Sequence, residues 1–265
     1  MMRLMNIASG SKGNATYVGN DHTHILIDSG VSRKRILEGL KKLDLTLQDL
    51  SAILVTHEHS DHISSLGVLE RTREIPVYTA GGTAKALINS GTLGSQSGLV
   101  QVIEPGRPFT IGDLTVTGLA TSHDAADPVC YRVDQGSTSC AVVTDLGVYD
   151  SRLVEELQGL SALILEANHD IRMLETGPYP YPVKLRIAGQ KGHLSNETSG
   201  RLLAELLNDD LQYVALGHLS PCNNTPDLAL LSVEYELCRF AEPRCMDRFR
   251  LDVADQEKGS AIFEF

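Results

Sequence analysis

Residues 53–62 read ILVTHEHSDH, and this stretch places four side chains that can bind metal within six residues: His57, His59, Asp61 and His62. The apolar residues 53–55 predict a short buried strand that leads into them. Two histidines two positions apart project to the same side of an extended segment and can bind one ion, while Asp61 and His62 turn toward a second. Solvated turns are built from Gly, Asn, Asp and Ser, so the pattern favours a two-metal site over a polar turn.

Apolar, β-branched runs that end at a polar side chain recur along the chain. Six of them end at a residue that can bind metal or phosphate: 25–27 at Asp28, 52–55 at His57, 114–120 at His123, 141–143 at Asp145, 163–165 at Glu166 and 213–216 at His218. Strands that share one functional edge explain this regularity, because loops at strand ends hold ligands on a rigid scaffold. A single histidine after a strand is equally well explained as a structural residue, but the recurrence favours His123, Asp145 and His218 as further ligands.

Helical segments alternate with these strands. Apolar residues recur at helical spacing in residues 33–42, 63–73, 84–90, 151–157 and 196–207. Ser195, which precedes Asn196 and Glu197, predicts a capped start for the last of these helices. Residues 177–183 are rich in proline, so they cannot form a central strand or a helix and are expected to run over the surface. The interleaved elements predict an α/β (α+β) fold.

Length and composition set wider limits. A chain of 265 residues with 42% hydrophobic and 22% charged residues can bury a full core, and we expect one domain over residues 1–265. No uncharged apolar run reaches about 18 residues, and Arg3 has no apolar segment behind it, so we expect a cytoplasmic protein without a membrane anchor. The net charge of −11 argues against a generally basic surface that wraps nucleic acid, although bound metal ions would add positive charge locally.

The residues outside the predicted site receive simpler interpretations. The chain has five cysteines, an odd number without a CxxC pair, and they are interpreted as buried reduced thiols: Cys130, Cys140, Cys222, Cys238 and Cys245. His22 and His24 are expected on the solvated surface. The oligomeric state is left open.

The order and spacing of the motifs resemble the metallo-β-lactamase superfamily over nearly the whole chain. The resemblance rests on ILIDSG around Asp28, THEHSDH at 56–62, TSHD around His123, VVTDLG around Asp145 and LGHLS around His218. It implies an αββα sandwich, in which two mixed sheets flanked by helices carry the metals at one edge. It also implies the following roles: His57, His59 and His123 hold the first metal, Asp61, His62 and His218 hold the second, Asp145 bridges the two, and Asp28 ties down the ligand loop.

Finer motifs favour a phosphodiester as the substrate. SGSKGNAT near the start, LEANHD, GHLSN and LGHLSPCNN resemble the YycJ (WalJ) branch, whose members are regarded as 5′-to-3′ DNA exonucleases. GHLSNE is also similar to an element of the tRNA 3′-processing nucleases, but the chain has neither their long arm nor the large insertion of the β-CASP nucleases. The resemblance therefore implies a DNA exonuclease with two divalent ions, Zn²⁺ or Mn²⁺, with iron as a further option.

The expected mechanism assigns two catalytic side chains. The two ions share a water whose pKa they lower, and the resulting hydroxide attacks phosphorus in line with the leaving oxygen. Asp61 orients this nucleophile, and His193 donates a proton to the leaving group or hydrogen-bonds a phosphate oxygen. The alternative for His193 is a capping role at the helix entry.

Five further residues are candidate substrate contacts: Ser11, Asn14, His169, Ser195 and Asn223. Ser11 and Asn14 lie in a Gly-rich stretch that could bind phosphate through backbone N–H groups, but it is also good chemistry for a hairpin turn. His169 could equally be a spare ligand or a hydrogen-bonded residue at the rim. Asn223 could instead support the loop after His218.

Two other functions compete with the DNA exonuclease. A phosphodiesterase for small or cyclic esters, or another hydrolase of this fold, predicts a narrow pocket and no dependence on substrate length, and RNA is an alternative polymer. A non-catalytic metal-binding regulator would have no need of Asp61, Asp145 or His193. A DNA path requires basic or aromatic side chains near the pocket mouth. The basic candidates are Lys12, Arg33, Lys34, Arg35, Lys184, Arg186 and Lys191.

Overall fold

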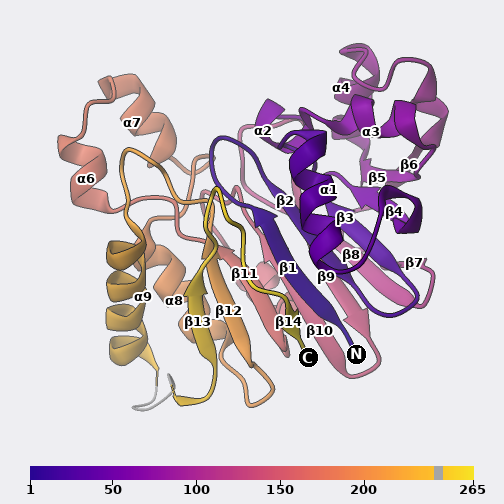
Figure 1. The fold of residues 1–265 in the computed structure, drawn as a ribbon. Coiled ribbons are helices and arrows are strands. Elements are labelled where there is room, and N and C mark those ends of the chain that lie inside the picture. The colour runs from indigo at the N-terminus through magenta and orange to yellow at the C-terminus, as the bar shows by residue number, and fades with distance from the viewer. Residues whose placement is uncertain (242–246) are drawn as a thin grey trace.

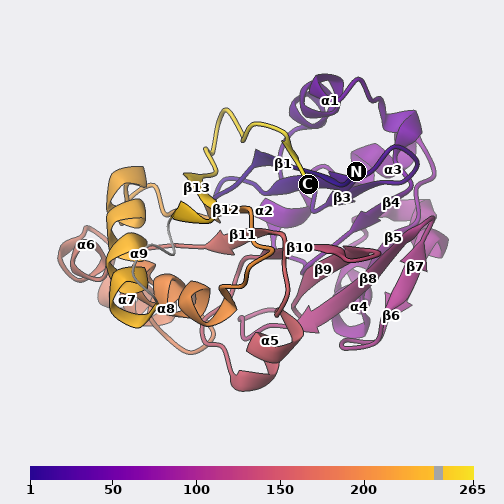
Figure 2. The same cartoon turned by 90° about the horizontal axis from the view of Figure 1, so that it is seen from below.

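Two seven-stranded sheets face each other, with helices on their outer sides (Figures 1 and 2). The computed structural model describes residues 1–241 and 247–265. The first sheet has the order β14-β1-β2-β3-β4-β5-β6 and the second β13-β12-β11-β10-β9-β8-β7. This αββα arrangement confirms the predicted fold class.

The strands are short, as in most layered α/β folds. The first sheet contains β1 (Arg3–Ala8), β2 (Ala15–Gly19), β3 (His24–Ile27), β4 (Ala52–Leu54), β5 (Val77–Ala80), β6 (Val100–Ile103) and β14 (Phe263–Glu264). The second contains β7 (Phe109–Ile111), β8 (Leu114–Ala120), β9 (Val129–Gln135), β10 (Thr138–Val143), β11 (Ala162–Glu166), β12 (Tyr213–Gly217) and β13 (Arg250–Val253).

The helices cover the outer faces of both sheets. They are α1 (Arg33–Lys42), α2 (Ser60–Ile63), α3 (Leu66–Thr72), α4 (Gly81–Asn89), α5 (Ser151–Glu156), α6 (Ile171–Thr176), α7 (Tyr181–Ile187), α8 (Asn196–Leu206) and α9 (Pro226–Phe240), with short 3₁₀ turns at Leu47–Asp49 and Gly94–Leu99. Within the described ranges, no helix is both long and apolar enough to cross a membrane.

Each sheet is mixed in the same way. β1, β2 and β3 pair antiparallel, whereas β3 to β6 pair parallel; β7 to β10 pair antiparallel, whereas β10 to β13 pair parallel. Every residue of β3, β4, β11 and β12 is buried, because both faces of these strands are covered. Parallel strands in one sheet end at the same edge, so the loops after β3, β4, β10, β11 and β12 meet there.

Apolar packing forms three layers. The middle cluster joins the inner faces of the two sheets through residues such as Ile25, Leu54, Val116 and Ile164. One outer cluster packs the first sheet against α1 and α3, and the other packs the second sheet against α5, α8 and α9. This packing fixes the edge on which the polar loops lie.

Some local predictions need correction. The predicted helix over 63–73 is two helices, α2 and α3, with a break at residues 64–65. The proline-rich stretch does run over the surface, but its last residues open α7, which was not predicted. Pro182 lies in the first turn of α7, where a proline is tolerated because the N–H groups there have no intrahelical acceptor.

The interpretation of the cysteines as buried holds for only part of the set. Cys130 and Cys140 are buried, whereas Cys222 and Cys238 are exposed; Cys245 lies outside the described residues. His24 is also buried, contrary to expectation, with its Nδ1 2.8 Å from the hydroxyl of Tyr17. The buried tyrosine supplies the polar partner that solvent was expected to supply.

Candidate metal centre

The polar strand-end residues converge at the upper edge of the sandwich in Figure 1, where α2 lies. Three of them have left-handed backbone conformations: Asp28 at φ 60°, Asp145 at φ 58° and His218 at φ 55°. In the described part of the chain only one other non-glycine residue, Asp44, has a positive φ. Such conformations are sparsely populated because each costs about 1–3 kcal/mol of conformational free energy. They concentrate at functional sites. The backbone is thus bent where it must turn side chains inward.

The first ligand group consists of His57, His59 and His123, whose ligand atoms lie within 4.8 Å of one another. His57 Nε2 lies 3.0 Å from His59 Nδ1, so both nitrogens face the same point. The remaining nitrogen of His57 is 3.0 Å from the hydroxyl of Thr56, and Nδ1 of His123 hydrogen-bonds the carbonyl of Gly192 at 3.1 Å. These bonds aim the free nitrogens of His57 and His123 inward.

The second group consists of Asp61, His62 and His218, which also converge within 4.8 Å. Asp145 lies between the two groups. Its Oδ2 is 3.1 Å from Nε2 of His62, and its Oδ1 is 3.6 Å from Nε2 of both His123 and His218. A carboxylate in this position can contact ions in both groups.

α2 is held close to the rest of the site by backbone contacts. Asn14 donates its backbone N–H to the carbonyl of Asp61 at 2.8 Å, and Ser29 donates to that of His62 at 2.7 Å. A Cβ on Gly30 would lie 1.5 Å from the Asp61 carbonyl oxygen, so only glycine fits there.

Two buried carboxylates orient the second group from behind. Asp28 Oδ2 is 2.7 Å from Nδ1 of His62, and Asp28 Oδ1 accepts the backbone N–H of Thr56 at 2.9 Å. Glu166 Oε1 lies 2.9 Å from Nδ1 of His218 and 2.8 Å from Nδ1 of His193. These bonds fix the rings of His62 and His218 so that their Nε2 atoms face Asp145, at 3.1 Å from Oδ2 and 3.6 Å from Oδ1.

Glu166 is the main residue that sequence reasoning missed. The sequence marks it as the end of a strand but indicates no role for it. Its second oxygen accepts the backbone N–H groups of Leu146 at 2.9 Å and Leu194 at 3.2 Å, so Glu166 is fully buried and fully hydrogen-bonded. Glu166 also falls within one ligand group with Asp145, His193 and His218, but its bonds identify it as a positioning residue. The signal that could have found it was the strand-end pattern itself.

The electrostatics of the centre favour cations. Burial lowers the pKa of both His57 and His123, so they are neutral and able to bind metal. Burial alone would also lower the pKa of His218, but Asp145, Asp61 and Glu166 outweigh it and raise that pKa to about 10. The carboxylates therefore stabilise positive charge at this position, and a metal ion would supply it directly.

Orphaned buried atoms provide an independent test of the fit. Oδ2 of Asp145 and Nε2 of His218 are buried without a hydrogen-bond partner of good geometry. Unpaired buried polar atoms are rare and destabilising, and these two point into a ring of imidazole nitrogens and carboxylate oxygens. This donor set fits divalent transition-metal ions.

His193 faces the centre rather than the helix that follows it. Its ring centroid lies 5.1 Å from that of His123 and 5.2 Å from that of His218, and its side chain is 15% exposed. Ser195 is the residue that caps α8, accepting the N–H of Thr198 at 3.2 Å, as predicted. The capping alternative for His193 is therefore wrong.

The other predicted substrate contacts occupy different settings. Asn14 Nδ2 is 3.0 Å from Nε2 of His62, at the centre itself, whereas Ser11 is exposed in the loop that joins β1 to β2. Asn223 is fully buried and donates to Ser220 Oγ at 3.3 Å, which favours support of the loop over substrate contact. His169 is buried, its Nδ1 has no partner, and burial lowers its pKa to about 4.

The basic candidates divide into structural and site-facing residues. Arg35 donates to backbone carbonyls of Ile7 and Gln256, and Lys184 donates to that of Glu175. Arg186 pairs with Asp124, and Asp124 Oδ1 lies 3.4 Å from Nε2 of His123. Arg186 is thus tied to the first ligand group. The remaining candidates belong to neither class. Lys12, Lys34 and Lys191 are exposed, and Lys34 lies 3.9 Å from Glu38; Arg33 is half-buried.

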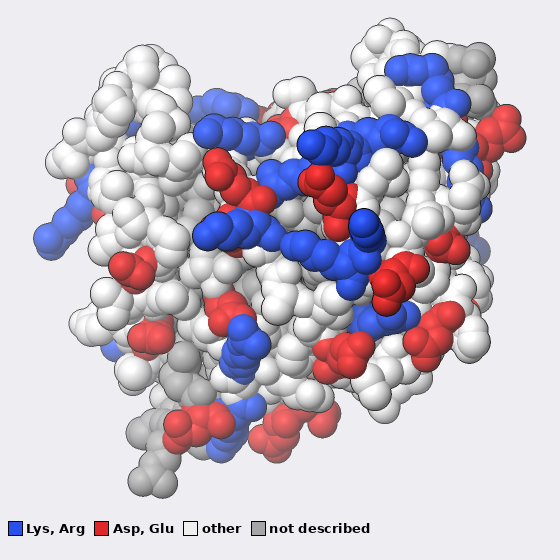
Figure 3. Space-filling model, viewed as in Figure 1, with Lys and Arg blue, Asp and Glu red and all other residues white. Residues whose placement is uncertain are grey.

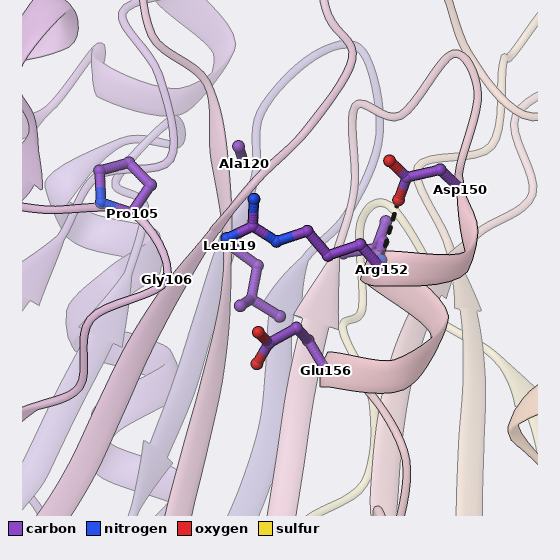
Figure 4. A pocket seen from close by; sticks show the side chains of 8 residues that line it. Pro105, Gly106, Leu119, Ala120, Asp150, Arg152 and Glu156 are labelled. Carbon is purple, nitrogen blue, oxygen red and sulfur yellow. Dashed lines mark hydrogen bonds between the residues drawn. The ribbon is translucent and has the colours of Figure 1, made fainter.

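A separate cavity of about 200 Å³ lies beside α5 (Figure 4). Pro105, Gly106, Leu119, Ala120, Asp150, Arg152, Leu153 and Glu156 line it. It contains no candidate ligand, and Asp150 there caps α5 by accepting the N–H of Leu153 at 2.9 Å. We assign it no part in the metal centre.

The chain is similar to known proteins over most of its length. Residues 23–213 match the Beta-lactamase superfamily domain. The chain is 38% identical to exodeoxyribonuclease YycJ of Bacillus anthracis, over 87% of both chains. It is 36% identical to exodeoxyribonuclease WalJ of Streptococcus pneumoniae, over 88% of this chain and 87% of that protein.

Solved structures support the fold. The metallo-β-lactamase fold protein YhfI from Bacillus subtilis aligns with a TM-score of 0.73 at 19% identity, covering 100% of this chain and 99% of that chain. Zn²⁺-bound PqqB from Methylobacterium extorquens aligns with a TM-score of 0.71 at 14% identity, covering 99% of this chain and 100% of that chain. The predicted family resemblance is confirmed.

Proposed function

The chain belongs to the beta-lactamase superfamily, in the branch of the YycJ and WalJ exodeoxyribonucleases, and from this premise we propose that it degrades DNA from an end, in the 5′-to-3′ direction. The observation that carries the proposal is the convergence of two ligand groups on one carboxylate, Asp145, at the edge where the two sheets meet. Such a site suits hydrolysis of phosphodiesters, whose charge two metal ions can neutralise.

In this proposal His57, His59 and His123 would hold the first ion, Asp61, His62 and His218 would hold the second, and Asp145 would serve both. We propose Zn²⁺ or Mn²⁺, with iron as a further option, because imidazole and carboxylate ligands accept all three. When bound, the ions activate water and stabilise the charge that develops on the phosphate oxygens.

Asp61 and Asp145 have different settings, which support different roles. The side chain of Asp61 is 24% exposed, whereas that of Asp145 is 4% exposed. Asp61 lies 3.6 Å from Nε2 of His62 and 3.8 Å from that of His218, at the open side of the group. It can therefore accept a hydrogen bond from the attacking water and orient it toward phosphorus.

His193 is placed to act as the proton donor to the leaving oxygen. Burial would raise the pKa of Glu166, but His193 and His218 outweigh it and lower that pKa to about 2, so Glu166 stays ionised. Glu166 Oε1 lies 2.8 Å from Nδ1 of His193 and holds that side of the ring, so Nε2 is the nitrogen that can pass a proton to the leaving oxygen. The departing sugar oxygen then leaves as a neutral hydroxyl.

The test uses purified protein loaded with Zn²⁺ or Mn²⁺. The substrates are end-labelled single-stranded and double-stranded DNA, RNA, and bis(p-nitrophenyl) phosphate, with His59→Ala as the control. Stepwise loss from the 5′ end that the control lacks would support the proposal. Cleavage of the small ester alone would replace it with a small-molecule phosphodiesterase, and inactivity of the fully metal-loaded protein on every ester would favour a non-catalytic regulator.

A further inference from the structure

One surface beside the metal centre has no role in the mechanism above. Residues 171–191, here called the α6–α7 lobe, lie between Glu166 and His193 in the chain and stand at the upper left corner of Figure 1. The lobe is fixed directly to the site. Ser122 Oγ donates to the carbonyl of Gln190 at 2.7 Å, and the N–H of His193 donates to the carbonyl of Ile187 at 2.9 Å.

The outer face of α7 is apolar and exposed, which is unusual for a helix of a globular protein. No residue of α7 is buried, and Tyr181 is 70% and Leu185 55% exposed. At 100° per residue, Tyr181, Leu185 and Arg186 lie within one arc of about 140°. Arg186 lies at one margin of this arc. Its side chain pairs with Asp124, which in turn lies beside His123 of the first ligand group.

The charge of the lobe opposes that of the whole chain. Residues 171–191 contain the basic side chains Arg172, Lys184, Arg186 and Lys191 and only one acidic side chain, Glu175, in a protein with a net charge of −11. Figure 3 shows a dip in the upper outline of the molecule beside the lobe, with Lys and Arg side chains on both of its sides. A local basic surface of this kind attracts a polyanion although the protein as a whole repels it.

We propose that the exposed face of α7, made of Tyr181, Leu185 and Arg186, binds the DNA strand next to the bond that is cleaved. The Tyr181 ring and the Leu185 side chain form a platform on which a base stacks, and the Arg186 guanidinium contacts a phosphate at the entrance to the metal centre. This proposal rests on the proposed DNA exonuclease function.

The surface chemistry favours a nucleic-acid strand over a second protein chain. An aromatic ring and an apolar side chain stand beside a cation, which is the combination that single-stranded nucleic-acid sites use. Arg186 keeps 58% of its side chain exposed despite its pairing with Asp124, so it can bind a phosphate without a change in the fold. A second copy of this chain would have to bring a net negative surface against the same face, and this alternative is one outcome of the test.

The test compares two substrates in metal-loaded protein: a single-stranded DNA of about 20 nucleotides, long enough to span the lobe, and bis(p-nitrophenyl) phosphate. Tyr181→Ala should raise KM for the DNA by about 10-fold, since stacking on an aromatic ring contributes this much, and leave kcat/KM for the small ester unchanged. Tyr181→Phe keeps the ring and should behave as the wild type. Tyr235→Ala removes a tyrosine of similar exposure, 63%, on α9, outside the lobe, and serves as the matched control.

The possible outcomes separate this proposal from the one on which it rests. If the wild type degrades DNA and Tyr181→Ala does so with the same KM, the lobe proposal is wrong and the exonuclease stands. If the wild type cleaves only the small ester, both fail. Loss of activity on both substrates would show damage to the centre and contradict the proposal. An unchanged KM together with altered self-association in light scattering would assign the face to a second copy.

Discussion

The two sheets build the metal centre in different ways. The first sheet supplies His57, His59, Asp61 and His62 from one loop and the short helix after β4. The second supplies one residue from each of three loops, His123, Asp145 and His218, which are far apart in sequence. The first half is therefore a local motif, whereas the second exists only once the strands have taken their order in the sheet.

The same contrast appears among the carboxylates behind the ligands. On the first side, Asp28 orients His62 alone among the histidines. On the second side, Glu166 orients His193 and His218 together and also accepts two backbone N–H groups. The ligands of the second side thus depend on one central hydrogen-bond acceptor, Glu166. Substitution of Glu166 should therefore reduce activity more than substitution of Asp28.

The largest effect is expected where the two halves meet. Asp145→Asn removes the carboxylate that both groups share, so we expect kcat/KM to fall by about 10³-fold or more and metal to be lost from both groups. His59→Ala should remove only the metal of the first group. The metal-to-protein ratio from mass spectrometry, beside the activity, separates the two variants. Full metal content in Asp145→Asn would contradict a bridging role.

The comparison of Asp28 with Glu166 gives the next prediction. Substitution of a group that orients a metal ligand reduces affinity or activity by about 10- to 100-fold. We expect Glu166→Gln to reach the upper end of this range and to lower kcat more than it raises KM, because both His218 and the proton donor His193 lose their partner. Asp28→Asn should weaken metal binding with a smaller effect on kcat.

The measurement is steady-state kinetics on DNA together with metal titration of both variants. Equal losses of kcat and of metal affinity in the two variants would contradict the asymmetry. A normal kcat for Glu166→Gln at saturating metal would rule out a proton-donor role for His193 that depends on Glu166.

The asymmetry also explains how far sequence reasoning could go. The dense loop at 57–62 was readable because it combines four ligand types in six residues, which few structural needs produce. The fold class followed from strands and helices that alternate. Glu166 could not be assigned from the sequence, because a glutamate after a strand becomes a site residue only when β10, β11 and β12 align in parallel. α7 was missed because its prolines mark a turn, while the first turn of a helix tolerates them.

The first side also contains a buried glutamate, Glu70, but its carboxyl group is not fully hydrogen-bonded as that of Glu166 is. Glu70 in α3 is 1% exposed, its Oε1 has no hydrogen-bond partner, and burial, aided by the nearby Glu74, raises its pKa to about 7. Its folded pKa lies above the usual 4.5, so the stability that its protonated form contributes is present at low pH and is lost as the pH rises through about 7.

Glu70→Gln removes this titration. We expect the variant to exceed the wild type in free energy of unfolding by on the order of 1–3 kcal/mol near pH 8, with the difference disappearing only below the ordinary glutamate pKa of 4.5. Urea unfolding at several pH values measures it. Glu74→Gln is the control, with a much smaller change. If the difference in free energy of unfolding between the variant and the wild type is the same at high and at low pH, Glu70 does not titrate in this range.

The smallest effect concerns the helix caps of the two halves and decides between two roles for Ser195. Ser195 accepts the N–H of Thr198 at 3.2 Å and is 7% exposed, whereas Ser32 caps α1 through a long 3.4 Å bond at the surface. Ser195→Ala should therefore destabilise the fold by about 1 kcal/mol, and Ser32→Ala by only a few tenths. Because the Ser195 hydroxyl is already engaged in capping, KM for DNA should stay at the wild-type value under conditions where the variant is folded. A raised KM in Ser195→Ala, without one in Ser32→Ala, would instead establish Ser195 as a substrate contact.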